Sequence, residues 1–227
     1  MSAAAAAPRE PERVLAPFGR RRVTIRSNRP SGGYRILEVA DHEGPPPAAG
    51  QFYMLAREGG WGEGGERPFL PRAFSVAAAS DDGDGVRLSF LLEDVGADTA
   101  ALAAAGEGGA LLITGPLGRP FSSPRELNPA AAGAILVGGG IGLAPLAIWR
   151  AELARRGIPE RSLLGFRDER HSGGLELFRC SEIRLASEDG HAGHRGYVTD
   201  LLERMLEGDS AATAVVYACG PPPMLEA

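Results

Sequence analysis

The stretch ILVGGGIGLAPL, residues 135–146, joins an apolar run to four glycines and then to a helix-forming segment. We interpret residues 135–137 as a buried strand, the glycines as a turn and residues 143–157 as a helix. Glycines let an anionic group approach the backbone closely, and a helix N-terminus offers unpaired N–H groups with partial positive charge. The stretch therefore predicts a phosphate-binding turn at the carboxyl end of a parallel strand, or else a tight structural turn.

The second half of the chain alternates apolar strands with helical patterns, which favours a parallel, Rossmann-like α/β sheet. The expected strands are 133–140, 161–167, 181–188 and 213–220, and the expected helices are 144–157 and 197–208.

The first half has short runs of mixed polarity separated by Gly/Pro-rich turns, a pattern typical of a β-barrel or β-sandwich. The expected strands are 21–27, 34–40, 50–56, 73–79, 86–92 and 110–115, with a helical segment at 97–106. We expect a disordered leader over 1–19, a β domain over 20–125 and an α/β domain over 126–227.

Composition excludes several classes of function. The formal net charge of −5 disfavours binding to nucleic acid or to an anionic membrane. All 24 basic residues are arginines, which excludes lysine Schiff-base chemistry. The two cysteines, Cys180 and Cys219, are too few for a disulfide framework, and no apolar run approaches the roughly 20 residues of a membrane span. These features and the lack of a signal peptide predict a cytoplasmic protein.

Two further segments carry candidate site residues. In LPRAFSV (70–76), Arg72 could pair with a diphosphate, Phe74 could stack on a flat heterocycle and Ser75 could hydrogen-bond a ring nitrogen. In YACGPPPML (217–225), Cys219 ends a strand that could lie on the same sheet edge as the glycine turn. The alternatives are an exposed arginine beside ordinary core residues and a buried cysteine acting as a small hydrophobe.

Together these segments resemble the ferredoxin–NADP reductase-like flavoprotein superfamily over about residues 20 to 227. RAFS resembles its flavin motif, VGGGIGLAP its nicotinamide-nucleotide pyrophosphate turn and CGPPPM its nicotinamide-side motif. GPLGRPF (115–121) and SEDGHAGHRGYVTDLL (187–202) are most similar to the electron-transfer subunits of class 1B dihydroorotate dehydrogenase.

The resemblance implies a six-stranded antiparallel FAD-binding barrel followed by a Rossmann-like nucleotide-binding domain. It implies FAD and NAD(H) as cofactors and an FMN-containing catalytic subunit as partner, in dihydroorotate oxidation for pyrimidine biosynthesis. In the family, electrons pass from FMN through a 2Fe-2S cluster and FAD to NAD. A stand-alone NAD(P)H-dependent flavin or ferredoxin reductase, a sulfhydrogenase-type subunit and a non-catalytic degenerate subunit are the alternatives. The choice between NAD and NADP stays open.

The resemblance also implies roles for individual residues. Arg72 would hold the FAD pyrophosphate, and Ser75 would lie near flavin N5 as a catalytic residue together with Cys219. The remaining positions matching FAD-contacting elements are Ala73, Phe74, Leu91, Leu92, Glu93, Asp98 and Thr99. Those matching the NAD pyrophosphate turn and the nicotinamide side are Gly138, Gly139, Gly140, Ile141, Gly142, Gly220 and Pro221.

The sequence departs from the family pattern in three places. Asp98 stands where glycine is common, which places a carboxylate near the expected phosphate, and Ala73 stands where proline is common. The chain reaches Ala227 before the family's Cys-rich tail, so we expect a truncated C-terminal end. Two cysteines fall short of the four thiolates of a 2Fe-2S cluster, and we predict no metal ligands, His191 and His194 included.

Overall fold

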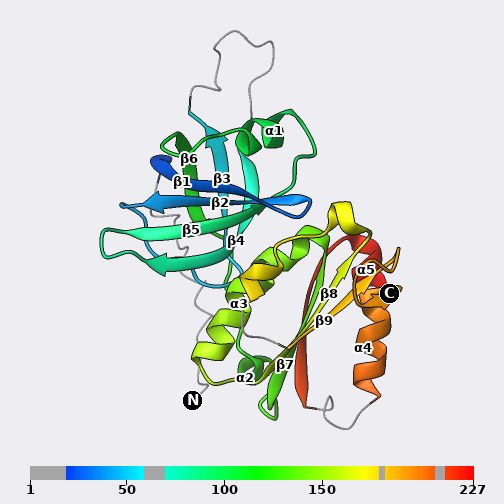
Figure 1. Ribbon diagram of the computed structural model, residues 1–227. Helices are drawn as coiled ribbons and strands as arrows, with labels where there is room; N and C mark the ends of the chain where they lie inside the picture. Colours follow the sequence, from blue (N-terminus) through cyan, green and yellow to red (C-terminus); the bar gives the residue numbers. More distant parts are fainter. Residues whose placement is uncertain (1–18, 59–69, 179–181, 208–212) are drawn as a thin grey trace, which may run out of the picture.

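The computed structural model describes residues 19–58, 70–178, 182–207 and 213–227. Nearly all of the expected leader, and Cys180, lie outside the described residues. The chain forms a β-barrel and a parallel α/β sheet with helix α3 (Leu143–Arg155) between them (Figure 1).

Six antiparallel strands close the barrel, which confirms the six-stranded fold implied by the resemblance. They are β1 (Arg21–Ser31), β2 (Tyr34–Asp41), β3 (Phe52–Arg57), β4 (Arg72–Asp81), β5 (Val86–Leu92) and β6 (Ala110–Leu117), in the order β1-β2-β5-β4-β3-β6. Helix α1 (Ala97–Ala103) links β5 to β6 and inserts Leu102 into the barrel core.

Alternation along the strands separates the barrel interior from its outer wall. Phe90 and Leu92 of β5 point into the barrel core, where Phe90 packs edge-on against Tyr53. Leu91, between them, joins the core cluster that contains α3 and the parallel sheet. Because successive side chains of a strand point to opposite faces, β5 contributes to two hydrophobic cores.

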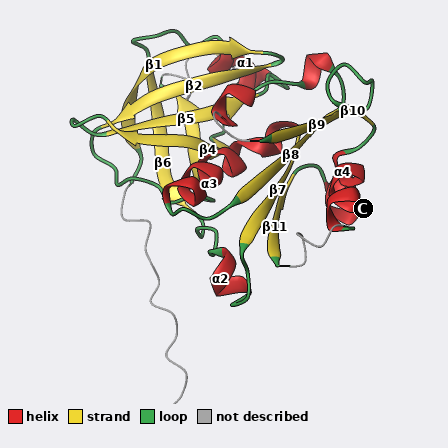
Figure 2. Ribbon diagram, turned by 60° about the horizontal axis from the view of Figure 1, so that its bottom comes forward, coloured by secondary structure: helices red, strands yellow, loops and turns green. Residues whose placement is uncertain are grey.

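The α/β domain is a parallel sheet, as predicted, and it has five strands where four were expected (Figure 2). Its strand order is β10 (His194–Arg195), β9 (Ile183–Ser187), β8 (Glu160–Phe166), β7 (Gly133–Gly139) and β11 (Ala214–Cys219). Helices α2 (Pro124–Leu127), α4 (Val198–Leu206) and α5 (Pro222–Glu226) and the short 3₁₀ turns Gly140–Gly142, Glu169–His171 and Leu175–Phe178 complete it. None of the helices in the described ranges has the length and apolar character that crossing a membrane requires.

Both faces of the sheet are buried, and adjacent side chains of β7 point to opposite faces. Ala134 and Leu136 pack in the core that contains α3, whereas Ile135 and Val137 pack in a separate core with α4. This explains why β7 reads as a continuous apolar run rather than an alternating one.

The barrel and the sheet share one hydrophobic core. Trp149 of α3 packs against Phe121 and Tyr217, and Ile148 packs against both the barrel core and the shared core. The expected boundary near residue 125 falls within α2, and it stays a prediction.

Polar contacts fasten the segment after β8 to the β1–β2 turn. The Tyr34 hydroxyl donates to the His171 carbonyl at 2.6 Å, and the Gly33 amide donates to the Ser172 carbonyl at 2.6 Å. Glu176 accepts from Arg29 Nη1 and from the Ser31 hydroxyl, each at 2.8 Å. These contacts fix the position of the barrel relative to the α/β domain.

Candidate functional site

A cavity of about 1100 Å³ lies between the barrel and the carboxyl ends of the parallel strands. Both domains line it, which is the usual position of a ligand site in open α/β sheets. Most of the residues singled out in the sequence line this cavity: Arg72, Ala73, Phe74, Ser75, Leu91, Glu93, Thr99, Gly139, Gly140, Ile141, Gly142, Cys219, Gly220 and Pro221. The structure thus brings together three segments that are far apart in the sequence.

Three predicted site residues lie outside the cavity lining. Leu92 is fully buried in the barrel core, and Gly138 lies within β7 beneath the turn, packed near Leu164. Asp98 forms an ion pair with Arg72 instead. The contact expected of Leu92 uses its backbone, so that role stays a prediction.

The glycine turn packs directly on the end of β11. Gly138 and Cys219 are register partners in the β7–β11 pair. A Cβ added at Gly142 would lie 2.4 Å from the Cys219 carbonyl oxygen, a separation that no real Cβ contact shows. Gly140 has φ of +54°, the left-handed region that favours glycine. The absence of side chains therefore serves the close approach of the turn to β11 as well as access to the cavity.

Strand β4 presents the RAFS segment along the barrel side of the cavity. Its residues pair with β3 in regular antiparallel register, with Arg72 opposite Leu55 and Ser75 opposite Phe52. The Arg72 side chain is 53% exposed, and its Nε donates to Asp98 Oδ2 at 2.6 Å. An arginine fork on the cavity wall suits a diphosphate, which accepts parallel hydrogen bonds.

The Thr99 hydroxyl is engaged within its own turn. It accepts from the amides of Val95 and Gly96, both at 3.0 Å, and donates to the Gly96 carbonyl at 2.9 Å. Thr99 lines the cavity, but these bonds first of all shape the start of α1.

Cys219 is half-buried on the cavity wall. Burial raises the pKa of its thiol because the thiolate loses solvation. A neutral thiol offers a small, polarisable surface rather than a nucleophile, which suits close packing against a flat ring.

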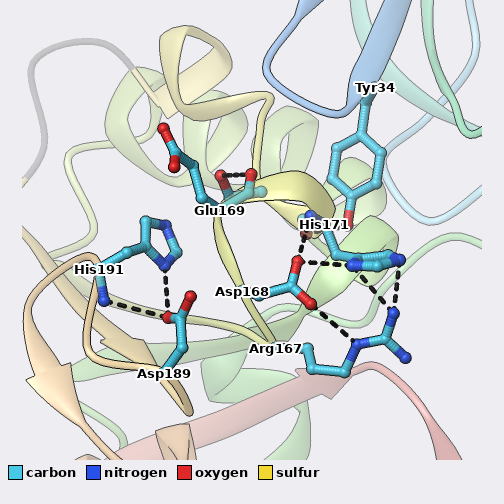
Figure 3. Close-up of polar contacts among 8 residues, drawn as sticks. Tyr34, Arg167, Asp168, Glu169, His171, Asp189 and His191 are labelled. Carbon is cyan, nitrogen blue, oxygen red and sulfur yellow. Dashed lines mark hydrogen bonds and ion pairs between the residues drawn. The ribbon is translucent and has the colours of Figure 1, made fainter.

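A polar cluster follows β8 at the cavity edge (Figure 3). His171 donates to Asp168 Oδ1 from its backbone amide at 2.9 Å and contacts the same oxygen through Nδ1 at 2.6 Å. These bonds lower the pKa of Asp168 to about 2, the hydrogen bond from the His171 side chain being the largest cause. Arg167 pairs with Asp168 Oδ2 at 3.2 Å. Tyr34, His171 and Arg167 all line the cavity.

The sequence pattern did not reveal Tyr34 or His171 as site residues. The Tyr34–His171 bond joins residues 137 positions apart, so no local spacing could reveal it. The far end of the cavity contains further residues that sequence reasoning missed, including Glu188 and the 61% exposed Tyr197.

The two histidines considered as metal ligands have separate carboxylate partners. His191 Nδ1 pairs with Asp189 at 2.8 Å, and His194 Nε2 pairs with Asp200 at 3.0 Å. Within the part of the chain that the structure describes, no group of three or more His, Cys, Asp or Glu side chains could hold a metal ion.

The site residues fit a flavin and a nicotinamide dinucleotide but not an iron–sulfur cluster. The cavity volume of about 1100 Å³ slightly exceeds the roughly 300–1,000 Å³ of ordinary small-molecule sites. Its wall offers an arginine fork, a glycine turn before α3 and apolar surface at Phe74 and Cys219. A 2Fe-2S cluster needs four ligands, and the 227 residues contain two cysteines.

Solved structures with this architecture define the class. The chain is similar to a ferredoxin NADP+ reductase from Neisseria gonorrhoeae with bound FAD and NADP, with a TM-score of 0.70 and 18% identity over 91% of this chain and 87% of that one. It is also similar to the ferredoxin reductase in carbazole 1,9a-dioxygenase, with a TM-score of 0.73 and 22% identity over 92% of this chain and 63% of that one. The chain therefore has the fold of the ferredoxin–NADP reductase-like flavoproteins.

Sequence relatives narrow the class and confirm the resemblance to dihydroorotate dehydrogenase electron-transfer subunits. The electron transfer subunit of dihydroorotate dehydrogenase B (NAD(+)) from Bacillus caldolyticus is 43% identical over 141 residues, which are 61% of this chain and 52% of that protein. Its counterpart from Caldanaerobacter subterraneus is 31% identical over 186 residues, 82% of this chain and 66% of that protein. The matched region spans about half to two thirds of the length of these relatives. No protein-family model matches the chain.

Proposed function

We propose that this chain is an FAD-dependent electron-transfer reductase subunit that passes electrons between a partner dehydrogenase and NAD. The observation that carries the proposal is the single cavity lined by the RAFS segment of β4, the glycine turn after β7 and the CGP segment after β11. Relatives of this chain are named as electron transfer subunits, which supports the same function.

Each segment would contribute a different part of the site. Arg72 would bind the FAD diphosphate, Phe74 would pack against the isoalloxazine and the Ser75 hydroxyl would hydrogen-bond near N5. The glycine turn and the start of α3 would bind the NAD pyrophosphate through backbone N–H groups. The small side chain of Cys219 would leave room for the nicotinamide ring.

When bound, the two cofactors supply hydride exchange between nicotinamide C4 and flavin N5. The protein has to orient the two rings and exclude water, and the reaction needs no protein acid or base. This matches the neutral thiol of Cys219 and the hydroxyl of Ser75, the only two residues assigned catalytic roles.

We propose that the cluster after β8 determines the coenzyme specificity. Arg167 would lie by the adenosine end of the nucleotide, but its guanidinium is already paired with Asp168. Glu188 lines the cavity and carries a further carboxylate, whereas Asp168 contacts the cavity through the lining residues Arg167 and His171. We therefore expect NADH to bind more tightly than NADPH, because an additional phosphate would meet these negative charges.

The partner and the setting are inferred from the relatives. We propose a hetero-oligomer with an FMN-containing dihydroorotate dehydrogenase subunit, acting in the cytoplasm in pyrimidine biosynthesis. A stand-alone reductase of the flavin, ferredoxin or sulfhydrogenase type is the second candidate function, since solved structures with this fold include ferredoxin reductases.

The visible absorption spectrum of the purified chain, before and after anaerobic NADH, tests the proposal. Flavin bands near roughly 375 and 450 nm that bleach on addition of NADH would support it, since these are properties of the cofactor. A colourless protein that does not take up added FAD would overturn it and favour a non-catalytic, degenerate subunit. Dihydroorotate oxidation by a co-purified partner would separate the first function from the second.

A further inference from the structure

Asp98 forms an ion pair with Arg72, the residue that the proposed function assigns to the FAD diphosphate. Arg72 Nε donates to Asp98 Oδ2 at 2.6 Å, and Nη2 contacts the same oxygen. The Asp98 side chain is only 15% exposed, whereas that of Arg72 is 53% exposed. The carboxylate is therefore the less exposed member of the pair.

The pair is arranged so that Asp98 stands behind Arg72. Arg72 lines the large cavity, and Asp98 does not. Both line a small recess on the other side of Arg72, together with Leu55, Leu70 and Leu102. Asp98 thus holds the arginine from the side opposite the proposed diphosphate, and it does not occupy the diphosphate's place.

The element that carries Asp98 is itself held rigidly. Leu102 of α1 is buried in the barrel core. The two N–H groups of the Asn28 side-chain amide are shared among the carbonyls of Leu102, Ala103 and Ala105, at 3.0, 3.1 and 2.8 Å, which anchors the end of α1 to β1. The Thr99 hydroxyl fixes the first turn through Gly96. A carboxylate on such an element can determine the conformation of a long side chain from another strand.

Guanidinium has five N–H donors in a planar fork. Asp98 accepts from the N–H of Nε and from one N–H of Nη2, which leaves both N–H groups of Nη1 and the second N–H of Nη2 to donate elsewhere. Without the carboxylate, an exposed arginine would lose conformational entropy when it binds a ligand. With Asp98 in place, much of that entropy is already lost before binding, so the entropy cost of binding is smaller. We propose that Asp98 is a positioning residue that pre-orients Arg72 for the diphosphate, an inference that rests on the proposed FAD site.

The test is a double-mutant cycle on FAD affinity, measured by flavin fluorescence with the full chain. Asp98→Ala should weaken binding by roughly tenfold, within the range of couplings between contacting residues, and should have less than about a twofold effect in an Arg72→Ala background. Asp98→Asn retains an oxygen acceptor and should recover most of the affinity. Asp94→Ala removes a carboxylate from an exposed position of the same segment and should change nothing.

A second readout does not depend on flavin. The Arg72 Nε–H proton should give a distinct, slowly exchanging NMR signal in the wild type that Asp98→Ala removes while the melting temperature stays close to the wild-type value. Equal or tighter FAD binding by Asp98→Ala, or an unchanged Arg72 signal, would overturn the positioning role. An ordered Arg72 signal that depends on Asp98, in a chain that binds no FAD, would instead overturn the proposed function and leave the positioning of Arg72 by Asp98 supported.

Discussion

The lowered pKa of Asp168 should make the stability of the folded protein depend on pH. This pKa falls from the ordinary value of 3.8 to about 2, chiefly through the hydrogen bond from the His171 side chain. A lowered folded-state pKa contributes stability above the unfolded pKa, and this contribution is lost as the pH falls through the folded value.

Asp168→Asn should therefore lower the melting temperature at pH 6, and its difference from wild type should shrink between about pH 4 and pH 2. Melting temperatures at a series of pH values measure this. Asp94→Asn, which removes one exposed carboxylate, is the matched control. A destabilisation that stays constant down to pH 2 would contradict the role given to ionised Asp168.

Cys219 supports a second prediction at this scale. Because burial raises the pKa of its thiol, we expect alkylation by iodoacetamide at pH 8 to be at least about tenfold slower than for a free cysteine. The measurement uses a Cys180→Ser background so that one thiol is followed by mass spectrometry. FAD and NADH together should slow labelling further. Rapid labelling unaffected by both cofactors would remove Cys219 from the site.

At the scale of single elements, the contact between the glycine turn and β11 is a steric one. Gly142 has φ of −61° and ψ of −11°, which alanine adopts readily, so only space opposes a side chain there. Gly142→Ala should destabilise the fold by about 1–3 kcal/mol through overpacking against the Cys219 carbonyl, and should weaken NADH binding.

Denaturant titration measures the change in the free energy of unfolding. Gly106→Ala is the control, because a Cβ at Gly106 would have no neighbour within 4 Å. If both variants were equally stable, the packing of the turn on β11 would be looser than the structure indicates.

The elements themselves were largely predictable from sequence. Each expected strand appears within a few residues of its predicted position, and the glycine stretch forms β7, a turn and α3. These elements were predictable because the hydrophobic period and the Gly/Pro residues at their ends are local features of the sequence. Strand β10 was missed, since two residues in a histidine- and glycine-rich loop carry no such signal. Helix α2 was not predicted, because its four residues are too few to show a helical period.

The candidate site was only partly predictable, for a physical reason. Motif residues such as Arg72 and Cys219 were found because their neighbours in sequence are distinctive. The Arg72–Asp98 pair and the Tyr34–His171 bond were not, because both depend on how the chain closes in space. Asp98 stood out in the sequence as a carboxylate close to an expected phosphate, and the structure turns it away from the cavity.

At the scale of the whole molecule, the two domains should unfold together. Helix α3 contributes to the core shared by the barrel and the sheet, and Ile148 also contacts the barrel interior. Ile148→Ala should lower stability by about 1–3 kcal/mol without splitting the unfolding transition. Differential scanning calorimetry of this variant, beside Leu206→Ala at a half-exposed position of α4, is the measurement. Two separate transitions in the wild type would show that the shared core does not couple the domains.

The position of α3 also bears on how this protein can be recombined with its relatives. In sequence α3 belongs to the α/β domain, but one of its faces packs against the barrel. Leu143 of α3 and Leu91 of the barrel both lie next to Gly174. A chimera joined near residue 125 would set one parent's helix against another parent's barrel. Chimeras that take α3 and its barrel neighbours from the same parent should be soluble more often. The set of residues that can be exchanged between relatives is therefore defined by packing and is not contiguous in sequence.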